Sequence, residues 1–387
     1  MYTDWFKLRK LPFRLRPDPE FLFLGSEAGP VLQALRGAVA SGHGLVCLLG
    51  EAGTGKTTLL HALAREYQGG TPVARVQQPS LTATELLDAL CEQFGLPPSA
   101  GTATSPAARL AGFITQESRQ GRKVLVLVDE AHRASTQLLR TLAELGTPTA
   151  APLVVLAGEP PLAQALSTLT AQGAPLNLLA TLQLPRLQPS QLAGYLEHRL
   201  QVAGNNGRSL FEPDTLAEIL RYTGGTPQLV NILCDCAMNH AEAHNTQRVG
   251  VPEIRDAVQE LKWVEFSARA PEAGASGSQR ALRPAVAGEL EVLHSGRQLR
   301  QLTLKPGKVV VGRGEEAGLR LDSPFVSRQH CQLITTADGT FVQDLGSTNG
   351  ILVNGEKRRM HRLAPGDRIV IGDHTLIYRE PTPAQPA

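Results

Sequence analysis

The residues with the clearest chemistry are Gly50-Glu51-Ala52-Gly53-Thr54-Gly55-Lys56-Thr57, which have the spacing G-x-x-x-x-G-K-[ST]. Glycines in such a loop let backbone N–H groups converge on phosphate oxygens, and a following helix adds partial positive charge. We expect Lys56 to contact the β- and γ-phosphates of ATP, and the Thr57 hydroxyl to ligate the Mg²⁺ ion that bridges them. Thr58 continues the helix. Residues 50–58 therefore predict a nucleotide site with ATP and Mg²⁺ as cofactors.

A pair of carboxylates provides the second part of this chemistry. The apolar run 124–128 ends at Asp129 and Glu130, and open α/β sheets bind ligands at the carboxyl ends of their strands. Asp129 is expected to hold Mg²⁺ together with Thr57, and Glu130 to orient and deprotonate the attacking water. Glu130 and Lys56 are thus the predicted catalytic residues of an ATPase. The letters Asp-Glu-Ala-His also occur in helicases, but this chain has room for one such core, so we set that interpretation aside.

Polar residues of another kind gather near the C-terminus, in loops between short strands. They are Arg313, Ser327, Arg328, Thr348 and Asn349. A dianionic phosphoryl group needs charge-assisted donors, and a guanidinium offers a planar pair of N–H bonds to its oxygens. Arginine clusters on rigid loops recur in readers of phosphorylated motifs. The set predicts a phosphopeptide site; the alternative is turn and cap chemistry in a sandwich that binds no ligand.

The pattern of apolar residues predicts the elements that position these side chains. Strands expected at 45–49, 73–76, 124–128 and 153–156 alternate with helices expected at 57–67, 83–94 and 107–116, which indicates an α/β core. Four helical stretches follow, at 190–202, 213–222, 227–244 and 251–263. From 290 to 378, short alternating strands separated by turn residues predict an all-β sandwich.

Bulk composition narrows the classes of partner. With 38 Lys+Arg and 36 Asp+Glu the net charge is +2, which gives no overall field for nucleic acid and argues against it as a partner. The apolar runs are far shorter than the roughly 20 residues of a membrane span, and the N-terminus lacks the pattern of a signal peptide. A cytoplasmic protein without membrane insertion is expected. The 5 cysteines are scattered in apolar segments, so Cys234 and Cys236 are interpreted as core residues of a helix.

The first two-thirds of the chain resemble the AAA+ ATPases of the ExeA (GspA) type, which are related to TniB-like transposition ATPases. Besides the loop 50–58 and Asp129-Glu130-Ala131, the resemblance includes Gly158-Glu159-Pro160, Leu184-Pro185 and Gly224-Gly225-Thr226-Pro227. It implies an α/β P-loop AAA+ core with an all-helical lid, assembly into a ring or dimer, and ATP-driven remodelling of a partner, with a secretion system as the expected setting.

Three positions depart from that family pattern. Residues 177–181 contain no arginine, Gln228 stands where the lid arginine is expected, and Glu159 replaces a neutral amide. An arginine at a γ-phosphate is worth about 10³- to 10⁵-fold in rate, so binding could persist while hydrolysis is lost. Arg186 or Arg199 could replace the missing arginines, and the sequence leaves both open.

Residues 290–378 resemble the forkhead-associated (FHA) domain, a β-sandwich that reads phosphothreonine. The resemblance implies that Arg313, Ser327 and Arg328 bind the phosphate and that Thr348 and Asn349 hold the peptide backbone, whereas Gly312 and His330 have structural roles. The expected domains are an AAA+ core at 1–184, a helical lid at 185–264, a flexible linker at 265–288, the FHA domain at 289–380 and a disordered tail at 381–387.

Three functions are consistent with these features. The preferred hypothesis is an ATPase that a threonine-phosphorylated partner directs through the C-terminal domain. The alternatives are a nucleotide-switched phosphopeptide adaptor with negligible turnover, and a DNA-transposition regulator, against which the near-neutral charge argues. Because the linker contains no threonine, internal phosphosites are expected, if anywhere, at Thr102 or Thr104.

Overall fold

The computed structural model describes residues 2–77, 82–96, 105–145, 152–269, 288–294, 296–304, 307–314, 317–336 and 339–379. Thr102, Thr104, most of the predicted linker and the C-terminal tail lie outside these residues. The chain forms two compact units, Met1–Val251 and Pro252–Ala387. Among the described residues, no helix is both long and apolar enough to pass through a lipid bilayer.

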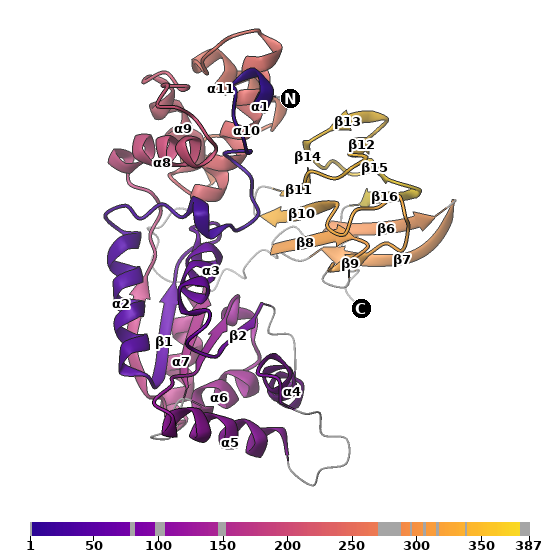
Figure 1. Cartoon of the computed structure of the whole chain (residues 1–387). Coiled ribbons are helices and arrows are strands. Elements are labelled where there is room, and N and C mark those ends of the chain that lie inside the picture. Colours follow the sequence, from indigo (N-terminus) through magenta and orange to yellow (C-terminus); the bar gives the residue numbers. More distant parts are fainter. Residues whose placement is uncertain are drawn as a thin grey trace, which may run out of the picture. The chain divides into compact units, whose positions relative to one another are not determined.

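A parallel sheet lies at the centre of the first unit, with its strands in the order β2-β3-β4-β1-β5 (Figure 1). The strands are β1 (Gly44–Leu49), β2 (Val73–Val76), β3 (Leu125–Val128), β4 (Leu153–Gly158) and β5 (Leu178–Gln183). Every residue of β1, β3 and β4 is buried, as expected where helices cover both faces of a sheet. The four predicted strands are confirmed. The edge strand β5 was not predicted, because its side chains are mostly exposed and give no buried apolar run.

Two hydrophobic cores lie on opposite faces of this sheet, since successive strand residues point to opposite sides. On one face, α2 (Ala28–Ser41) and α3 (Lys56–Tyr67) pack against Val46 and Leu48 of β1. On the other face, Leu45 and Cys47 contact a second group of helices. These helices are α4 (Ala83–Gln93), α5 (Pro106–Arg119), α6 (Thr136–Leu145) and α7 (Pro161–Ala171). The sequence predicted α3, α4 and α5 but not α2, α6 or α7.

The helical stretches that follow are confirmed as α8 (Pro189–Val202), α9 (Thr215–Thr223), α10 (Pro227–Ala243) and α11 (Val251–Glu260). Proline occupies the first turn of α8 and of α10, where its missing N–H costs nothing. The N-terminal segment, with the short helices α1 (Tyr2–Trp5) and η1 (Pro19–Phe21), buries Tyr2, Phe6 and Phe13. Because α11 crosses the division between the units, the end of the helical subdomain stays a prediction.

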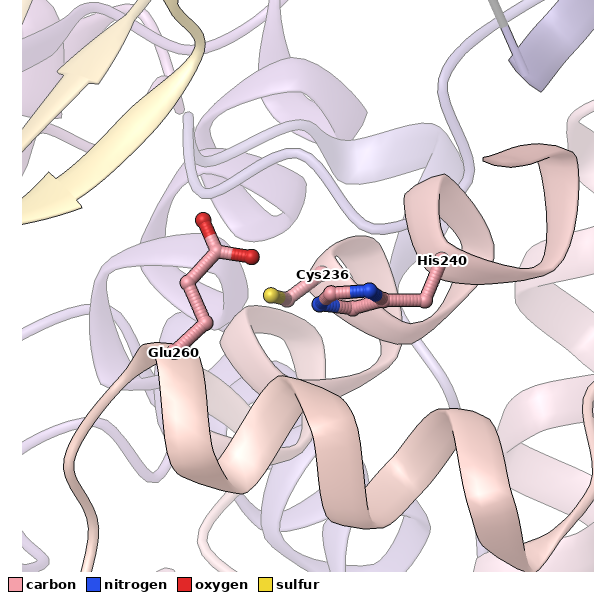
Figure 2. A group of neighbouring side chains, drawn as sticks. All are labelled: Cys236, His240 and Glu260. Carbon is pink, nitrogen blue, oxygen red and sulfur yellow. The ribbon is translucent and has the colours of Figure 1, made fainter. Parts of the chain in front are cut away.

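Helix α10 carries the Cys-x-Cys pair. Cys234 and Cys236 are both buried, and burial raises the pKa of the Cys234 thiol well above its ordinary value. Figure 2 shows Cys236 beside His240, one turn further along the same helix. The burial of both cysteines agrees with their interpretation as residues of a core helix.

The second unit contains α12 (Phe266–Arg269) and a sandwich of two sheets with strand orders β14-β11-β10-β8-β9 and β13-β12-β15-β16-β6-β7 (Figure 1). Its strands are β6 (Gly288–His294), β7 (Arg297–Leu304), β8 (Gly307–Gly312), β9 (Leu319–Arg320), β10 (Cys331–Thr336), β11 (Gly339–Asp344), β12 (Ile351–Val353), β13 (Glu356–Arg358), β14 (Met360–Arg362), β15 (Arg368–Ile371) and β16 (His374–Arg379). Side chains such as Val292, Leu333 and Ile369 fill the space between the sheets. The predicted all-β sandwich is confirmed.

Candidate nucleotide and phosphopeptide sites

The glycine-rich loop connects β1 directly to α3. Gly53 and Gly55 have φ values of 78° and 103°, in the left-handed region that favours glycine. Gly55 is the N-cap residue of α3, and no side chain caps this helix end. The first N–H groups of α3 are therefore available to an anion, as a phosphate site requires. Glu51 and Ala52 form the exposed part of the loop, and Thr54 closes it by donating a hydrogen bond to the Glu51 carbonyl at 2.9 Å.

Lys56 lies inside the curve of this loop and is only 5% exposed. Its Nζ donates to the carbonyl oxygens of Gly50 and Glu51, at 2.8 and 2.9 Å. Burial lowers the pKa of Lys56, and the nearby carboxylates, with Glu130 first among them, oppose that shift. An ammonium held among carboxylates in this way can pair with the β- and γ-phosphates of a nucleotide.

Thr57 and Asp129 meet across the sheet edge. The Thr57 hydroxyl donates to Asp129 Oδ2 at 2.6 Å. Burial raises the pKa of Asp129, and the hydrogen bond from Thr57 partly offsets this effect. The two side chains present adjacent oxygen ligands, which is the donor type that Mg²⁺ prefers. Thr58 is the third residue of α3 and continues the helix.

Glu130, which directly follows Asp129, has an unusual backbone conformation. Its φ and ψ are 52° and 30°, in the left-handed region that residues other than glycine rarely adopt. Such a conformation costs roughly 1–3 kcal/mol and occurs preferentially at functional sites. The backbone N–H of Glu130 donates to Asp129 Oδ1 at 3.0 Å, which stabilises the turn. The carboxyl group of Glu130 lies near Nε2 of His132, at 3.8 Å, and near Nη1 of Arg133, at 4.0 Å.

His132 lies between two carboxylates, although the sequence did not identify it as a site residue. Its Nδ1 accepts a hydrogen bond from the backbone N–H of Glu159 at 3.2 Å, so the Nε2 carries the proton of the neutral ring. That Nε2 lies 3.8 Å from Glu130 Oε2 and 3.7 Å from Glu159 Oε1. The three residues meet because β3 and β4 are neighbouring parallel strands that end at the same edge. His132 is therefore placed to orient Glu130.

The helical part of the unit contacts the same loop through the first turn of α10. The backbone N–H of Gln228 donates to the Gly53 carbonyl at 3.1 Å. A side chain at Gly53 would collide with Gln228 Cβ. The residue at the expected lid-arginine position thus contacts the phosphate loop, but with an uncharged side chain.

The structure shows which of Arg186 and Arg199 lies near the nucleotide loop and could replace the missing arginines. Arg186 forms an ion pair with Glu51, on the phosphate loop itself. Arg199 is buried, and its guanidinium donates to the carbonyls of Pro12 and Arg14 at 2.7 and 3.1 Å. Arg199 therefore anchors the N-terminal segment, and Arg186 is the one of the two that lies near the nucleotide loop.

In the second unit, two loops bring the predicted phosphate ligands together. The backbone N–H of Arg313 donates to the Ser327 carbonyl, and that of Gly314 to the Arg328 carbonyl, each at 3.0 Å. A Cβ atom at Gly312 would overlap the Arg328 carbonyl oxygen, so glycine is needed for this close approach. The side chains of Arg313 and Arg328 are exposed beside the half-buried Ser327. Two guanidinium groups and a hydroxyl on neighbouring loops suit a phosphate dianion.

A third loop adds the remaining predicted residues. The backbone N–H of Thr348 donates to Ser327 Oγ at 3.2 Å, and Asn349 Nδ2 donates to the Phe325 carbonyl at 2.9 Å. His330, which is fully buried, connects the loop of Ser327 to the loop of Gly350. Its Nδ1 accepts from the Ser327 N–H at 3.1 Å, and its Nε2 lies 3.0 Å from the Gly350 carbonyl. The structure thus brings all five predicted residues to one end of the sandwich.

Comparison with known proteins supports both predicted domains, the ATPase core and the C-terminal sandwich. An AAA domain model matches residues 39–166, and an FHA domain model matches residues 309–372. General secretion pathway protein A of Aeromonas hydrophila is 33% identical over 269 residues, which cover 68% of this chain and 49% of that protein. This chain thus spans about half the length of that relative.

Two further relatives match the C-terminal part. The oxoglutarate dehydrogenase inhibitor of Corynebacterium diphtheriae is 38% identical over 121 residues, which cover 31% of this chain and 82% of that protein. A solved FHA domain, described in connection with phosphothreonine-dependent interactions, is 32% identical, covers 26% of this chain and 99% of its own, and has a TM-score of 0.23. The chain therefore combines a segment that matches the AAA domain model with a C-terminal FHA domain, and 68% of it is similar to part of general secretion pathway protein A.

Proposed function

We propose that this protein binds ATP with Mg²⁺, hydrolyses it, and is directed to threonine-phosphorylated partners by its FHA domain. The observation that carries the proposal is the convergence of Lys56, Thr57 and Asp129, with the Thr57 hydroxyl 2.6 Å from Asp129, beside the uncapped start of α3. Residues 50–58 enclose the phosphates through backbone N–H groups, and Lys56 pairs with the β- and γ-phosphates. Thr57 and Asp129 hold the ion.

Glu130 acts as the general base in this proposal. Bound Mg²⁺ supplies charge neutralisation to the phosphates. Glu130 accepts a proton from the attacking water, and His132 Nε2–H, 3.8 Å from Glu130 Oε2, limits the positions of the carboxyl group. Arg186, released from Glu51, is near enough to the loop to replace the absent lid arginine. In this proposal the ATPase core spans 1–184 and the helical lid spans 185–264, so Arg186 lies just after the boundary between them.

The FHA domain at 289–380 reads the partner. Arg313, Ser327 and Arg328 bind the phosphate oxygens, and Thr348 and Asn349 hold the peptide backbone. The linker at 265–288 joins this reader to the ATPase. We further propose that the protein acts in the cytoplasm, where ATP is available, assembles with copies of itself, and serves a secretion system, as the name of its Aeromonas relative suggests.

A second candidate function is a nucleotide-switched adaptor with negligible turnover. It is favoured by Gln228, which contacts the phosphate loop with an uncharged side chain, and by the carboxyl group of Glu159, which adds negative charge near the phosphates. Steady-state phosphate release by the full chain, compared with Glu130→Gln, separates the two functions. A clear difference supports the ATPase, and equal background rates support the adaptor.

His132→Ala tests the orientation of the proposed base. Without the imidazole, Glu130 and Glu159 lose the group that lies between their carboxylates, and we expect kcat for ATP hydrolysis to fall roughly 10- to 100-fold because the base is misplaced. The dissociation constant for ATP should change little. His132→Gln, which can donate an amide N–H to a carboxylate, should recover part of the rate. An unchanged kcat in His132→Ala would mean that His132 only packs between the strands.

A further inference from the structure

A pair of histidines lies at one end of the sandwich, apart from the five residues assigned to the phosphopeptide. His294 ends β6 and His374 begins β16, and the two residues are direct cross-strand partners on neighbouring strands (Figure 1). Their rings stack with centroids 4.6 Å apart and planes 27° from parallel. Asp373, in the turn between β15 and β16, directly precedes His374. Three side chains that can ligate a metal ion therefore lie together at the ends of neighbouring strands.

Both imidazoles face the carboxyl group of Asp373. His294 Nε2 lies 3.0 Å from Asp373 Oδ2, and His374 Nδ1 lies 3.0 Å from Asp373 Oδ1. The three ligand atoms all lie within 4.8 Å of one another. Around a tetrahedral Zn²⁺ ion with bonds of about 2.0–2.2 Å, ligand atoms are separated by about 3.3 Å. Small side-chain rotations would therefore bring these atoms to coordinating positions.

The surroundings suit a bound ion. Ser323 donates a hydrogen bond to the carboxyl group of Asp373. This bond holds the carboxyl group in orientation, as outer partners of metal ligands usually do. The side chains of His294 and Asp373 are 41% and 36% exposed, so an ion and a completing water molecule can reach them. His374 is buried and gives the site a rigid base.

We propose that His294, Asp373 and His374 form a site for a divalent transition-metal ion of the Zn²⁺ type. Two imidazoles and one carboxylate match zinc and its neighbours in the first transition row, whereas Mg²⁺ and Ca²⁺ prefer all-oxygen sets. To coordinate through the nitrogens that face Asp373, each neutral imidazole must carry its proton on its other ring nitrogen, so a ring that donates to Asp373 changes tautomer when the ion binds. The three residues belong neither to the proposed ATP site nor to the proposed phosphopeptide site.

The site also touches the segment that carries Ser327. Ser323 belongs to that segment, and Gly372, in the same turn as Asp373, lies so close to Phe325 that a Cβ atom there would approach Phe325 Cβ to 3.0 Å. A bound ion would therefore tie the turn at 372–373 to the loop of the phosphopeptide site. We expect Zn²⁺ to raise the melting temperature of the full chain, because a ligand that binds only the folded state stabilises it.

Zn²⁺ titration of the full chain by calorimetry, with excess Mg²⁺ present to occupy oxygen-rich sites, tests the proposal. We expect Zn²⁺ affinity at this site to fall at least about 100-fold in His294→Ala, which removes a ligand, and in Asp373→Asn, which replaces a charged oxygen ligand by a weak neutral one. The control is His361→Ala, because His361 forms a similar 3.0 Å pair with Asp367 but has no second histidine in that pair.

Each outcome is decisive. Loss of one class of Zn²⁺ binding in both ligand variants, with binding retained in His361→Ala, supports the site. Identical titrations of the wild type and both ligand variants, all with unchanged circular dichroism, would overturn it. If His294→Ala lowers the metal-free melting temperature, Asp373→Asn, which preserves the side-chain shape, decides the question.

Discussion

Replacing Glu130 by Gln is expected to lower steady-state ATP hydrolysis by the full chain at least about 100-fold, because the substitution removes a general base without removing any phosphate contact. The amide has nearly the same shape as the carboxyl group, so the left-handed turn at Glu130 and the hydrogen bond to Asp129 should persist. ATP should therefore remain bound with an affinity close to that of the wild type. Phosphate release, measured under saturating ATP, reports the rate.

Glu159→Gln is the matched control for this experiment. Glu159 also lies near His132 Nε2, at 3.7 Å, but it follows β4 and is not the proposed base. Its replacement should preserve hydrolysis or increase it, because it removes a negative charge close to the phosphates. Equal rates in the wild type and Glu130→Gln would contradict the assignment of Glu130 and leave the adaptor function.

Arg313→Ala is expected to weaken binding of a phosphothreonine peptide roughly 30- to 100-fold. Hydrogen bonds to a charged group contribute about 1.5–3 kcal/mol, and a loss of about 2–3 kcal/mol corresponds to that change in dissociation constant. Because the hydrogen bond that joins Arg313 to the neighbouring loop comes from its backbone N–H, 3.0 Å from the Ser327 carbonyl, removing the exposed side chain should leave the fold intact. Fluorescence polarisation with phosphorylated and unphosphorylated forms of each peptide measures the effect.

Arg300→Ala serves as the control for charge alone. Arg300 is exposed on β7, the edge strand of the other sheet, and its loss should leave peptide affinity unchanged. If a peptide array gave indistinguishable patterns with wild type and Arg313→Ala, the phosphothreonine-reading role would be wrong. A matching loss in both arginine variants would indicate nonspecific attraction to positive charge.

The nucleotide loop could be predicted because its chemistry depends on local spacing. Glycines at 53 and 55 must accept positive φ, and Lys56 and Thr57 must begin the helix, so one short segment specifies both structure and ligand. The sandwich was predictable for a related reason, since turn residues separate its strands at regular intervals. The expected fold classes were confirmed on this basis.

Features that depend on contacts between distant segments could not be predicted. The partner of His132, the backbone of Glu159, follows a different strand and meets it only because β3 and β4 are neighbours. The histidine directly after the acidic turn was the one available signal. Arg186 and Arg199 were equivalent in sequence, and only the structure shows that one contacts Glu51 and the other the N-terminal segment. Strand β5 was missed because Leu178 and Leu179 are exposed at the sheet edge.

The central claim is that the loop between β1 and α3 holds Mg²⁺–ATP through the Lys56 ammonium. Equilibrium dialysis of the full chain against labelled ATP and Mg²⁺ tests it most directly, with Lys56→Ala beside the wild type and Glu130→Gln as a variant that should still bind. We predict retention of ATP by the wild type and Glu130→Gln, and a loss of at least about 100-fold in affinity for Lys56→Ala, because a desolvated charge pair is removed. Absence of retention by the wild type, or retention that Lys56→Ala leaves unchanged, would contradict the account.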